Sequence, residues 1–195
     1  KRSFSFLFSC KILYTLPMKP VKTSRVILRQ FREGDEEQIY QYASVEGVGE
    51  RAGWKHHANV QESQSVLYNV FLKNPNCFAI TDRESEKIIG SFELSSSSLS
   101  NDFPECEHTY EIGYVLSKDY WNQGIMTELV NEVIQELIKE GETDLLFIRA
   151  NQENKASIKV IEKSGFFCYK IMQDIYNARI DRKETHLCFY LRLKR

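Results

Sequence analysis

The clearest pattern of apolar and polar positions lies in the second half of the chain. The alternation over residues 108–116 predicts a strand, because side chains in a strand point to opposite faces in turn. One of its faces carries Tyr110, Ile112, Tyr114 and Leu116. Residues 124–140 have an apolar pair every four positions, which is typical of a helix with one buried stripe. The apolar run 145–150 predicts a strand that is buried on both faces.

This order of strand, helix and strand predicts a parallel pair of strands joined by a right-handed crossover. The remaining patterns predict a strand at 25–31, helices at 36–43 and 61–73, a hairpin of 77–81 with 87–94, a helix at 155–164, and two last strands at 166–172 and 184–193. Residues 44–60 are rich in glycine around Trp54 and indicate loop and short helix. The sequence therefore predicts a mixed α/β sheet with four helices.

Length and charge narrow the class of protein. The chain has 195 residues, of which 42% are apolar and 27% charged, values that suit one folded domain. The net charge of −1 provides no basic field for nucleic acid. No apolar run reaches the roughly 20 residues that a membrane span needs, so we expect no membrane partner.

The positions of the cysteines indicate the cellular compartment, and those of the histidines indicate whether the chain binds a metal. Five cysteines are scattered without a CxxC spacing, which indicates reduced thiols in a cytoplasmic protein. The four histidines lack an HExxH spacing, so we predict no metal.

The first 17 residues form a separate segment. Lys1 and Arg2 precede an apolar run that weakly resembles a signal peptide, but the run contains Lys11 and lacks a small-residue cleavage site. We interpret 1–17 as an extension or an expression-derived leader, with a targeting role as the alternative, and 18–195 as a single domain.

A candidate phosphate site lies where the strand 108–116 meets the following helix. A helix N-terminus offers unpaired backbone N–H groups and a positive dipole end, and Gly124 leaves the backbone there open to close approach. Lys118 is the only basic side chain within 117–128, so backbone donors would hold the phosphate. The alternative is an ordinary turn that happens to contain a glycine.

Four segments, taken in order, carry a family resemblance. They are LRQF (28–31), IIGSFEL (88–94), EIGYVLSKDYWNQGIMTEL (111–129) and NKASIKVIEKSGF (154–166). Together they resemble the GNAT superfamily of N-acetyltransferases over roughly residues 24–193, and are most similar to the branch of ribosomal-protein alanine and serine acetyltransferases. The resemblance implies the GNAT fold, a mixed and mostly antiparallel sheet with two splayed central parallel strands flanked by helices. Trp121 and Met126 depart from the superfamily's phosphate motif and resemble variants common in this branch.

The resemblance implies acetyl-CoA as co-substrate. The backbone of Val115 and Leu116 would contact it, and Asn154 matches an asparagine beside the pantetheine arm; a helix cap also explains Asn154 fully, and the two roles are compatible. The phosphates would be held by Gln123, Gly124, Ile125, Met126 and Thr127.

The reaction implied is attack of an amine on a thioester, which requires removal of a proton from the amine and protonation of the departing thiolate. Many relatives supply a tyrosine four residues before the Gly-Phe pair, where this chain has Ile161. The ribosomal-protein branch has a serine instead, and Ser157 matches it. Ser157 is equally explained as a polar residue in the first turn of a helix.

Glu111 is the first choice for the base, with a carboxylate paired to a basic neighbour as the alternative. A water relay without a single base stays open, and His108 is a weaker candidate. The substrate pocket is predicted from Trp54, His56 and Tyr114, with His57 beside them. Tyr114 is also explained as core, and the residues near Trp54 as a surface cluster.

These observations predict an N-acetyltransferase that moves an acetyl group from acetyl-CoA to a primary amine, either a protein N-terminus or a small molecule, in a ternary complex. The alternative is a non-catalytic acyl-CoA-binding sensor or partner-binding module. The protein is expected as a monomer or homodimer.

Overall fold

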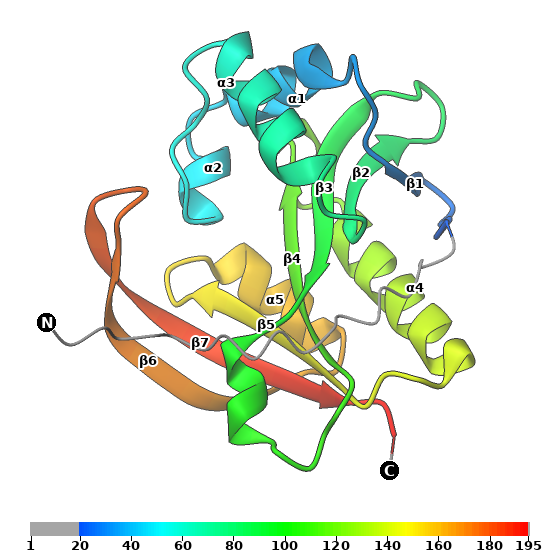
Figure 1. The fold of residues 1–195 in the computed structure, drawn as a ribbon, viewed down its shortest axis with the longest axis vertical. Coiled ribbons are helices and arrows are strands. Elements are labelled where there is room, and N and C mark those ends of the chain that lie inside the picture. The colour runs from blue at the N-terminus through cyan, green and yellow to red at the C-terminus, as the bar shows by residue number, and fades with distance from the viewer. Residues whose placement is uncertain (1–19, 195) are drawn as a thin grey trace, which may run out of the picture.

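A computed structural model describes residues 20–194, in which seven strands form one sheet (Figure 1). In chain order the strands are β1 (Val26–Gln30), β2 (Cys77–Asp82), β3 (Ile88–Ser95), β4 (Thr109–Leu116), β5 (Leu145–Asn151), β6 (Phe167–Asn177) and β7 (Arg182–Arg192). Their order across the sheet is β1-β2-β3-β4-β5-β7-β6. Only β4 and β5 run parallel, as the strand-helix-strand pattern predicts, and every other pair is antiparallel.

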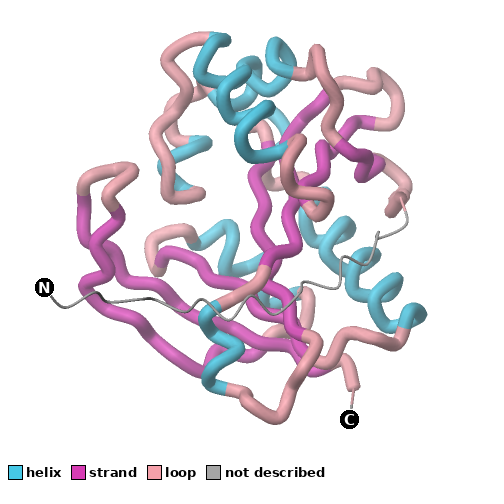
Figure 2. The backbone as a smooth tube through the Cα atoms, in the orientation of Figure 1, coloured by secondary structure: helices cyan, strands magenta, loops and turns pink. Residues whose placement is uncertain are grey.

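Helices lie on both faces of this sheet (Figures 1 and 2). They are α1 (Glu36–Ala43), α2 (Val48–Arg51), α3 (Val60–Val66), α4 (Ile125–Glu140) and α5 (Lys155–Lys163). Short 3-10 segments occur at Ser98–Asp102 and Lys118–Tyr120. Within the described residues no helix has the length and apolar character needed to cross a bilayer.

The parallel pairing of β4 with β5 is short. It joins Thr109 to Leu145, Tyr110 to Leu146 and Glu111 to Phe147, and it stops there. From Ile112 onward β4 remains paired with β3 only, while β5 follows β7 and diverges from β4 (Figure 1). The sheet is therefore split at its centre, which confirms the fold class predicted from the sequence.

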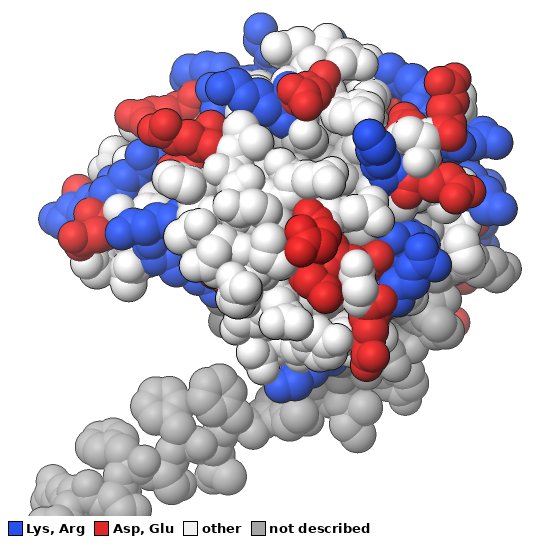
Figure 3. All heavy atoms as spheres, turned by 90° about the horizontal axis from the view of Figure 1, so that it is seen from above, with Lys and Arg blue, Asp and Glu red and all other residues white. Residues whose placement is uncertain are grey.

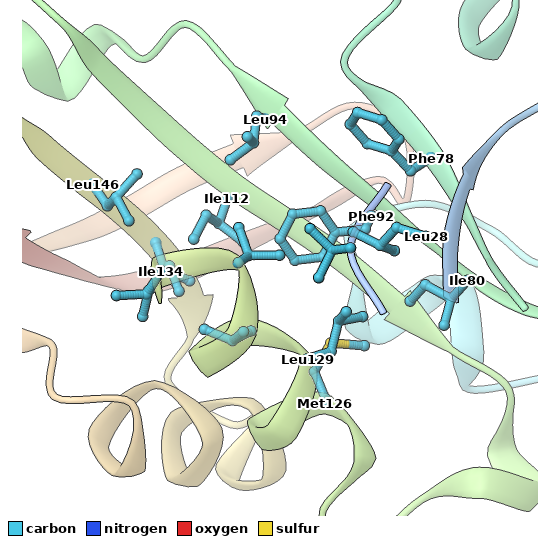
Figure 4. Packing of buried hydrophobic residues seen from close by; sticks show 14 of the residues in the cluster. Leu28, Phe78, Ile80, Phe92, Leu94, Ile112, Met126, Leu129, Ile134 and Leu146 are labelled. Carbon is cyan, nitrogen blue, oxygen red and sulfur yellow. The ribbon is translucent and has the colours of Figure 1, made fainter. Parts of the chain in front are cut away.

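The main core lies between the sheet and α4. The stripe of α4 that includes Met126, Leu129, Val133 and Leu137 is buried against Phe92 of β3 and its neighbours (Figure 4). Burying large side chains of this kind contributes about 1.5–3 kcal/mol each, so α4 holds the two halves of the split sheet together. Ile138, which the pattern placed in the stripe, is instead 46% exposed.

Two smaller clusters cover the opposite face and leave a space between them. One packs α1 and the following residues on β2 and β3, around Ile39, Tyr42 and Leu67. The other packs the loop after β3 on β5 and β7, around Leu99, Phe147 and Cys188. The split between β4 and β5 opens between these two clusters.

Some element boundaries differ from those predicted. The helix predicted at 61–73 is α3 followed by a π-helical segment, Leu67–Phe71. The strand predicted at 166–172 continues to Asn177, because register shifts at Cys168/Lys170 and Met172/Ile175 break the alternation that the prediction followed. The segment 1–17 lies outside the described residues.

Candidate active site

A cavity of about 950 Å³ lies at the split in the sheet. Tyr114, Leu116 and Ile148 line it from the face covered by α4. Gly113, Val115 and Arg149 line it from the opposite face, since neighbouring residues of a strand point to opposite sides. Side chains from both faces of the sheet therefore line the same cavity, between β4 and β5.

The start of α4 forms one wall of the cavity. Asn122 and Gly124 both have positive φ, 58° and 77°, so the chain turns sharply and the first N–H groups of α4 are left without intrahelical partners. Trp121 fixes this turn, because its Nε1 donates to the carbonyl oxygen of Leu116 at 2.7 Å. The guanidinium of Arg51 lies over the Trp121 ring, 4.6 Å from its centroid.

An ion pair anchors the same turn from outside. Nη1 of Arg25 donates to the carbonyl oxygen of Gln123 at 2.7 Å, and its Nη2 lies 2.5 Å from Oε2 of Glu128. Burial alone would raise the pKa of Glu128, but hydrogen bonds from Thr23, Ser24 and Arg25 outweigh it and lower that pKa to about 2. The sequence did not indicate that Arg25, far away in the chain, contributes a cation to this loop.

Most of the residues predicted to hold the cofactor line the cavity. They are Val115, Leu116, Gly124, Ile125, Met126, Thr127 and Asn154. Gln123 does not, because its side-chain amide points away and donates to the carbonyl oxygen of Asp119 at 2.8 Å. Its neighbour Asn122 lines the cavity instead.

The start of α5 forms the opposing wall. Oδ1 of Asn154 accepts from the backbone N–H of Ser157 at 3.2 Å, so Asn154 caps the helix, and its Nδ2 donates to the carbonyl oxygen of Arg51 at 3.2 Å. The Oγ of Ser157 lies 2.9 Å from the phenolic oxygen of Tyr114. Burial raises the pKa of Tyr114 to about 12, so its hydroxyl keeps its proton at neutral pH. Ile161, where the family resemblance led us to look for a tyrosine, is fully buried in the core.

Glu111 lies beside the cavity without lining it. Its Oε1 accepts from Nε of Arg149 at 2.6 Å, and its Oε2 accepts from Nη2 of Arg149 and from the Ser97 hydroxyl. The residue is only 8% exposed. The basic partner considered as the alternative for Glu111 is therefore present, and it ties β4 to β5 at the last paired position. His108 is likewise outside the cavity lining.

The residues predicted for the substrate pocket divide into two groups. Trp54 and Tyr114 line the cavity, and so does His57, whose Nδ1 lies 2.7 Å from the Ser63 hydroxyl. Burial lowers the pKa of His57, so it is neutral at pH 7. His56 instead faces away and pairs with Oε1 of Glu50 at 2.8 Å.

Several charged side chains line the cavity that sequence reasoning did not single out. They are Arg51, Lys55, Glu62, Glu93, Arg149, Lys159, Lys163, Arg179 and Glu184. Lys159 and Lys163 are four residues apart on α5, a spacing visible in the sequence once that helix is placed on the cavity. Nothing in the sequence indicated Arg179, because it belongs to the turn between β6 and β7.

The tip of that turn lies beside the end of α2, as Figures 1 and 2 both show. The Asn177 side chain joins them, since its Nδ2 donates to the carbonyl oxygen of Gly53 at 3.0 Å and to Oε2 of Glu184 at 3.0 Å. Among residues 20–194 no group of three or more histidine, cysteine or acidic side chains is arranged to hold a metal ion.

Comparison with known proteins identifies the family to which this fold belongs. Residues 25–167 match the profile of the acetyltransferase (GNAT) domain. The uncharacterized N-acetyltransferase YnaD of Bacillus subtilis is 25% identical over 153 residues, which are 74% of this chain and 81% of YnaD.

Solved structures show the same fold. The ribosomal-protein-S5-alanine acetyltransferase of Vibrio fischeri has a TM-score of 0.67 at 20% identity, covering 90% of this chain and 97% of its own. The Microcin C7 self-immunity acetyltransferase MccE, solved with acetyl-CoA and AMP, has a TM-score of 0.71 at 18% identity, covering 90% of this chain and 98% of its own. At these identities the likeness establishes the fold, and the acceptor has to be argued from this chain's own residues.

Proposed function

The chain belongs to the GNAT family of acetyltransferases, and from that premise we propose that it transfers the acetyl group of acetyl-CoA directly to a primary amine bound in the same cavity. The acceptor is a small molecule or a protein N-terminus. Free cysteines at positions 77, 106, 168 and 188 support a reducing compartment such as the cytoplasm.

The residues of the cavity fit acetyl-CoA. The backbone of β4 from Ile112 to Leu116 is paired with β3 on one side only, and its other edge offers hydrogen-bonding groups to an extended, amide-containing arm such as pantetheine. The first turn of α4 offers backbone N–H groups to a pyrophosphate. Lys159 and Lys163 line the cavity from α5 and add cationic side chains to these backbone donors. When bound, acetyl-CoA would supply an activated acetyl thioester.

Ser157 and Tyr114 are the groups we assign to the leaving thiolate. Their 2.9 Å contact gives the serine hydroxyl a proton-bearing neighbour, so a proton donated by Ser157 can be replaced from Tyr114. The phenol suits this role because it remains protonated at neutral pH. Proximity of the two bound substrates supplies a further part of the rate.

The base that accepts the proton of the amine is a separate question. That Glu111 is this base stays a prediction. Both of its carboxylate oxygens contact Arg149, and Glu111 would lose this ion pair if it accepted a proton. Monomer and homodimer also remain the predicted assembly states.

The single observation that carries the proposal is the split between β4 and β5, with the turn of Gly124 at one wall and the Ser157–Tyr114 pair at the other. The test is incubation with acetyl-CoA and a panel of amines that includes peptide N-termini, polyamines, amino acids and aminoglycosides, following release of the thiol. We expect amine-dependent thiol release. Tight binding of acetyl-CoA with no release for any amine would overturn the proposal and favour the acyl-CoA sensor.

A further inference from the structure

Glu93 points into the cavity from the face opposite α4 and α5. It lies on β3, directly across from Gly113 of β4, and it lines the cavity together with Ser91 of the same strand. Ser157 and Tyr114 approach from the other face of the sheet. A carboxylate and a hydroxyl pair thus stand on the two sides of the split, where one substrate can enter from each face.

Gly113 leaves the space beside this carboxylate open. It is exposed although it lies in a central strand, and a Cβ built on it would meet only Glu93, at 3.9 Å from its Cβ and 4.0 Å from Oε2. The room that a side chain would fill is therefore available to a ligand next to Oε2. The other carboxylate oxygen, Oε1, accepts from the amide of Asn74 at 3.1 Å, so Oε2 is the oxygen that faces this space.

Burial is the main reason that the pKa of Glu93 is raised above its usual value, and the neighbouring charge of Glu111 adds to this effect. Contacts with Cys77 and Asn74 and the charge of Arg179 act in the opposite direction without cancelling it. The two acids differ in kind, since Glu111 has Arg149 as a close partner and Glu93 has no ion pair within 4.0 Å in the part of the chain that the structure describes.

Arg179 faces the same space from the turn between β6 and β7. Its backbone is fixed, because its N–H donates to Oδ1 of Asn177 at 3.0 Å. Across residues 20–194 its guanidinium makes no ion pair within 4.0 Å, yet it is near enough to act on Glu93 electrostatically. A carboxylate and a guanidinium that share a cavity without touching are complementary to a ligand that carries both an ammonium and an anionic group.

We propose that Oε2 of Glu93 binds and deprotonates the acceptor amine, and that Arg179 binds an anionic group on the same acceptor. The acceptor class is thus a primary amine that carries a carboxylate or comparable anion, such as an amino acid or a peptide N-terminus with a nearby acidic group. This inference rests on the proposed function and adds to it the base and the acceptor class.

The reaction releases one proton in total to solvent. Glu93 takes one proton from the ammonium and passes it to water, which leaves a neutral amine. The nitrogen then bonds to the acetyl carbon and the carbon–sulfur bond breaks. The nitrogen loses a second proton to Glu93, which passes it to water, and the thiolate receives a proton from Ser157. Ser157 regains its proton from Tyr114 and Tyr114 from water, so the second proton is balanced and every group returns to its starting state.

The first test compares Glu93→Gln with Glu111→Gln, using whichever amine of the panel gives the fastest thiol release. The Glu93→Gln side chain keeps an acceptor oxygen for Asn74 but cannot take a proton. We expect kcat/KM for the amine to fall by about 10²–10⁴-fold with KM for acetyl-CoA unchanged, and part of the loss to be recovered at high pH, where the free amine is already neutral. Glu111→Gln should lower Tm without creating this recovery at high pH.

The outcomes separate the two proposals. If the wild-type protein gives no thiol release with any amine, the proposed function fails and the inference fails with it. If the wild-type protein is active and Glu93→Gln is equally active, the function stands and Glu93 is not the base. Glu93→Ala is the second variant, with acetyl-CoA binding as the measure of folding, in case the glutamine variant is unstable.

The second test concerns Arg179 and uses matched acceptors, L-alanine against L-alaninamide and the C-terminally amidated dipeptide Ala-Asp-NH2 against Ala-Asn-NH2, with spermidine as a purely cationic amine. We expect the wild-type protein to prefer the anionic member of a pair by at least tenfold in kcat/KM, and Arg179→Gln to remove that preference. A preference for spermidine, or a preference for the anion that survives Arg179→Gln, would overturn the assigned acceptor class.

Discussion

The phenolic oxygen of Tyr114 lies 2.9 Å from the Oγ of Ser157, and this contact joins β4 to α5 across one side of the split sheet. A buried phenol needs a hydrogen-bond partner, and Ser157 supplies it from α5. The backbone N–H of Ser157 donates to Oδ1 of Asn154, and both Ser157 and Tyr114 line the cavity. The pair is therefore a feature of the site, and its chemistry can be tested by substitution.

Removing the serine hydroxyl should slow the chemical step. We expect Ser157→Ala to lower kcat by about 10–100-fold with little change in KM for acetyl-CoA, and Tyr114→Phe to have a smaller effect in the same direction. A thioester with a more acidic thiol should reduce the loss. Ser164→Ala at the other end of α5 is the control, because the Ser164 hydroxyl has no partner within the described residues. An equal loss in that variant would indicate damage to α5 rather than a proton donor.

Comparing the glycines at the two ends of α4 tests whether Gly124 has a role in binding acetyl-CoA beyond that of an ordinary helix-end glycine. Gly124 and Gly141 have similar φ values of 77° and 71°; a Cβ at Gly141 would meet nothing within 4 Å, and one at Gly124 would be in ordinary contact with Nη2 of Arg25 at 3.8 Å. Both Gly→Ala variants should lose about 1–2 kcal/mol of stability from backbone strain. Only Gly124→Ala should also weaken acetyl-CoA binding, by tenfold or more in calorimetry. Equal affinities in the two variants would contradict a phosphate site at this turn.

Stability should fall in acid because of Glu184. Burial would raise its pKa, but hydrogen bonds from Asn177, Arg182, His186 and Asn151 lower it to about 2. A lowered pKa in the folded state stabilises the protein above pH 4.5 or so, and this contribution is lost as the pH falls toward 2.

Glu184→Gln should accordingly lower the free energy of unfolding at pH 7 by about 2 kcal/mol and flatten its dependence on pH between 5 and 2. Urea unfolding at several pH values measures both effects. The exposed Glu46→Gln is the control and should follow the wild-type curve. A Glu184→Gln variant as stable as the wild type at pH 7 would show that these hydrogen bonds contribute little.

Gly49 is required by the position of Trp54. A Cβ at Gly49 would lie 2.4 Å from the Trp54 ring and 2.7 Å from its carbonyl oxygen, so the backbone and the indole must both move. We expect Gly49→Ala to lose about 1–3 kcal/mol, to change the tryptophan fluorescence and to raise KM for the amine. Gly47→Ala has open space but a φ of 86°, so it should lose stability without the change in fluorescence.

The sequence predicts much of the fold because its strongest signals are local. The alternation of β4, the stripe of α4 and the apolar run of β5 each follow from the side chains within one element, and their order fixes the parallel pair. The π-helical segment after α3 and the bulges of β6 were not predictable in this way, because tertiary packing decides them. Ile138 shows the same limit, since an apolar pair at helical spacing does not determine which of its members is buried.

The candidate site was predictable only where it follows a motif. The turn of Gly124 and the position of Ser157 come from contiguous segments. The contacts of Glu111 with Arg149, and the approach of Arg179 to Glu93, join residues that are 38 or more positions apart in the chain. Charge arrangement over such distances depends on the folded structure. On the face drawn in Figure 3, Lys and Arg are mixed with Asp and Glu around a largely uncharged centre, which matches the low net charge.

The three-residue pairing of β4 with β5 has a consequence beyond the site. Beyond that pairing, β4 has an edge in the middle of the sheet that faces no partner strand. The backbone N–H and C=O groups along this edge are as available as those of an outer strand. An outer edge invites other chains to pair with it, whereas this one is flanked by two half-sheets and covered by α4. The amides along the inner edge should therefore exchange with deuterium readily in the free protein and slowly once a ligand completes the ladder, while the protein avoids the aggregation to which exposed edges are prone.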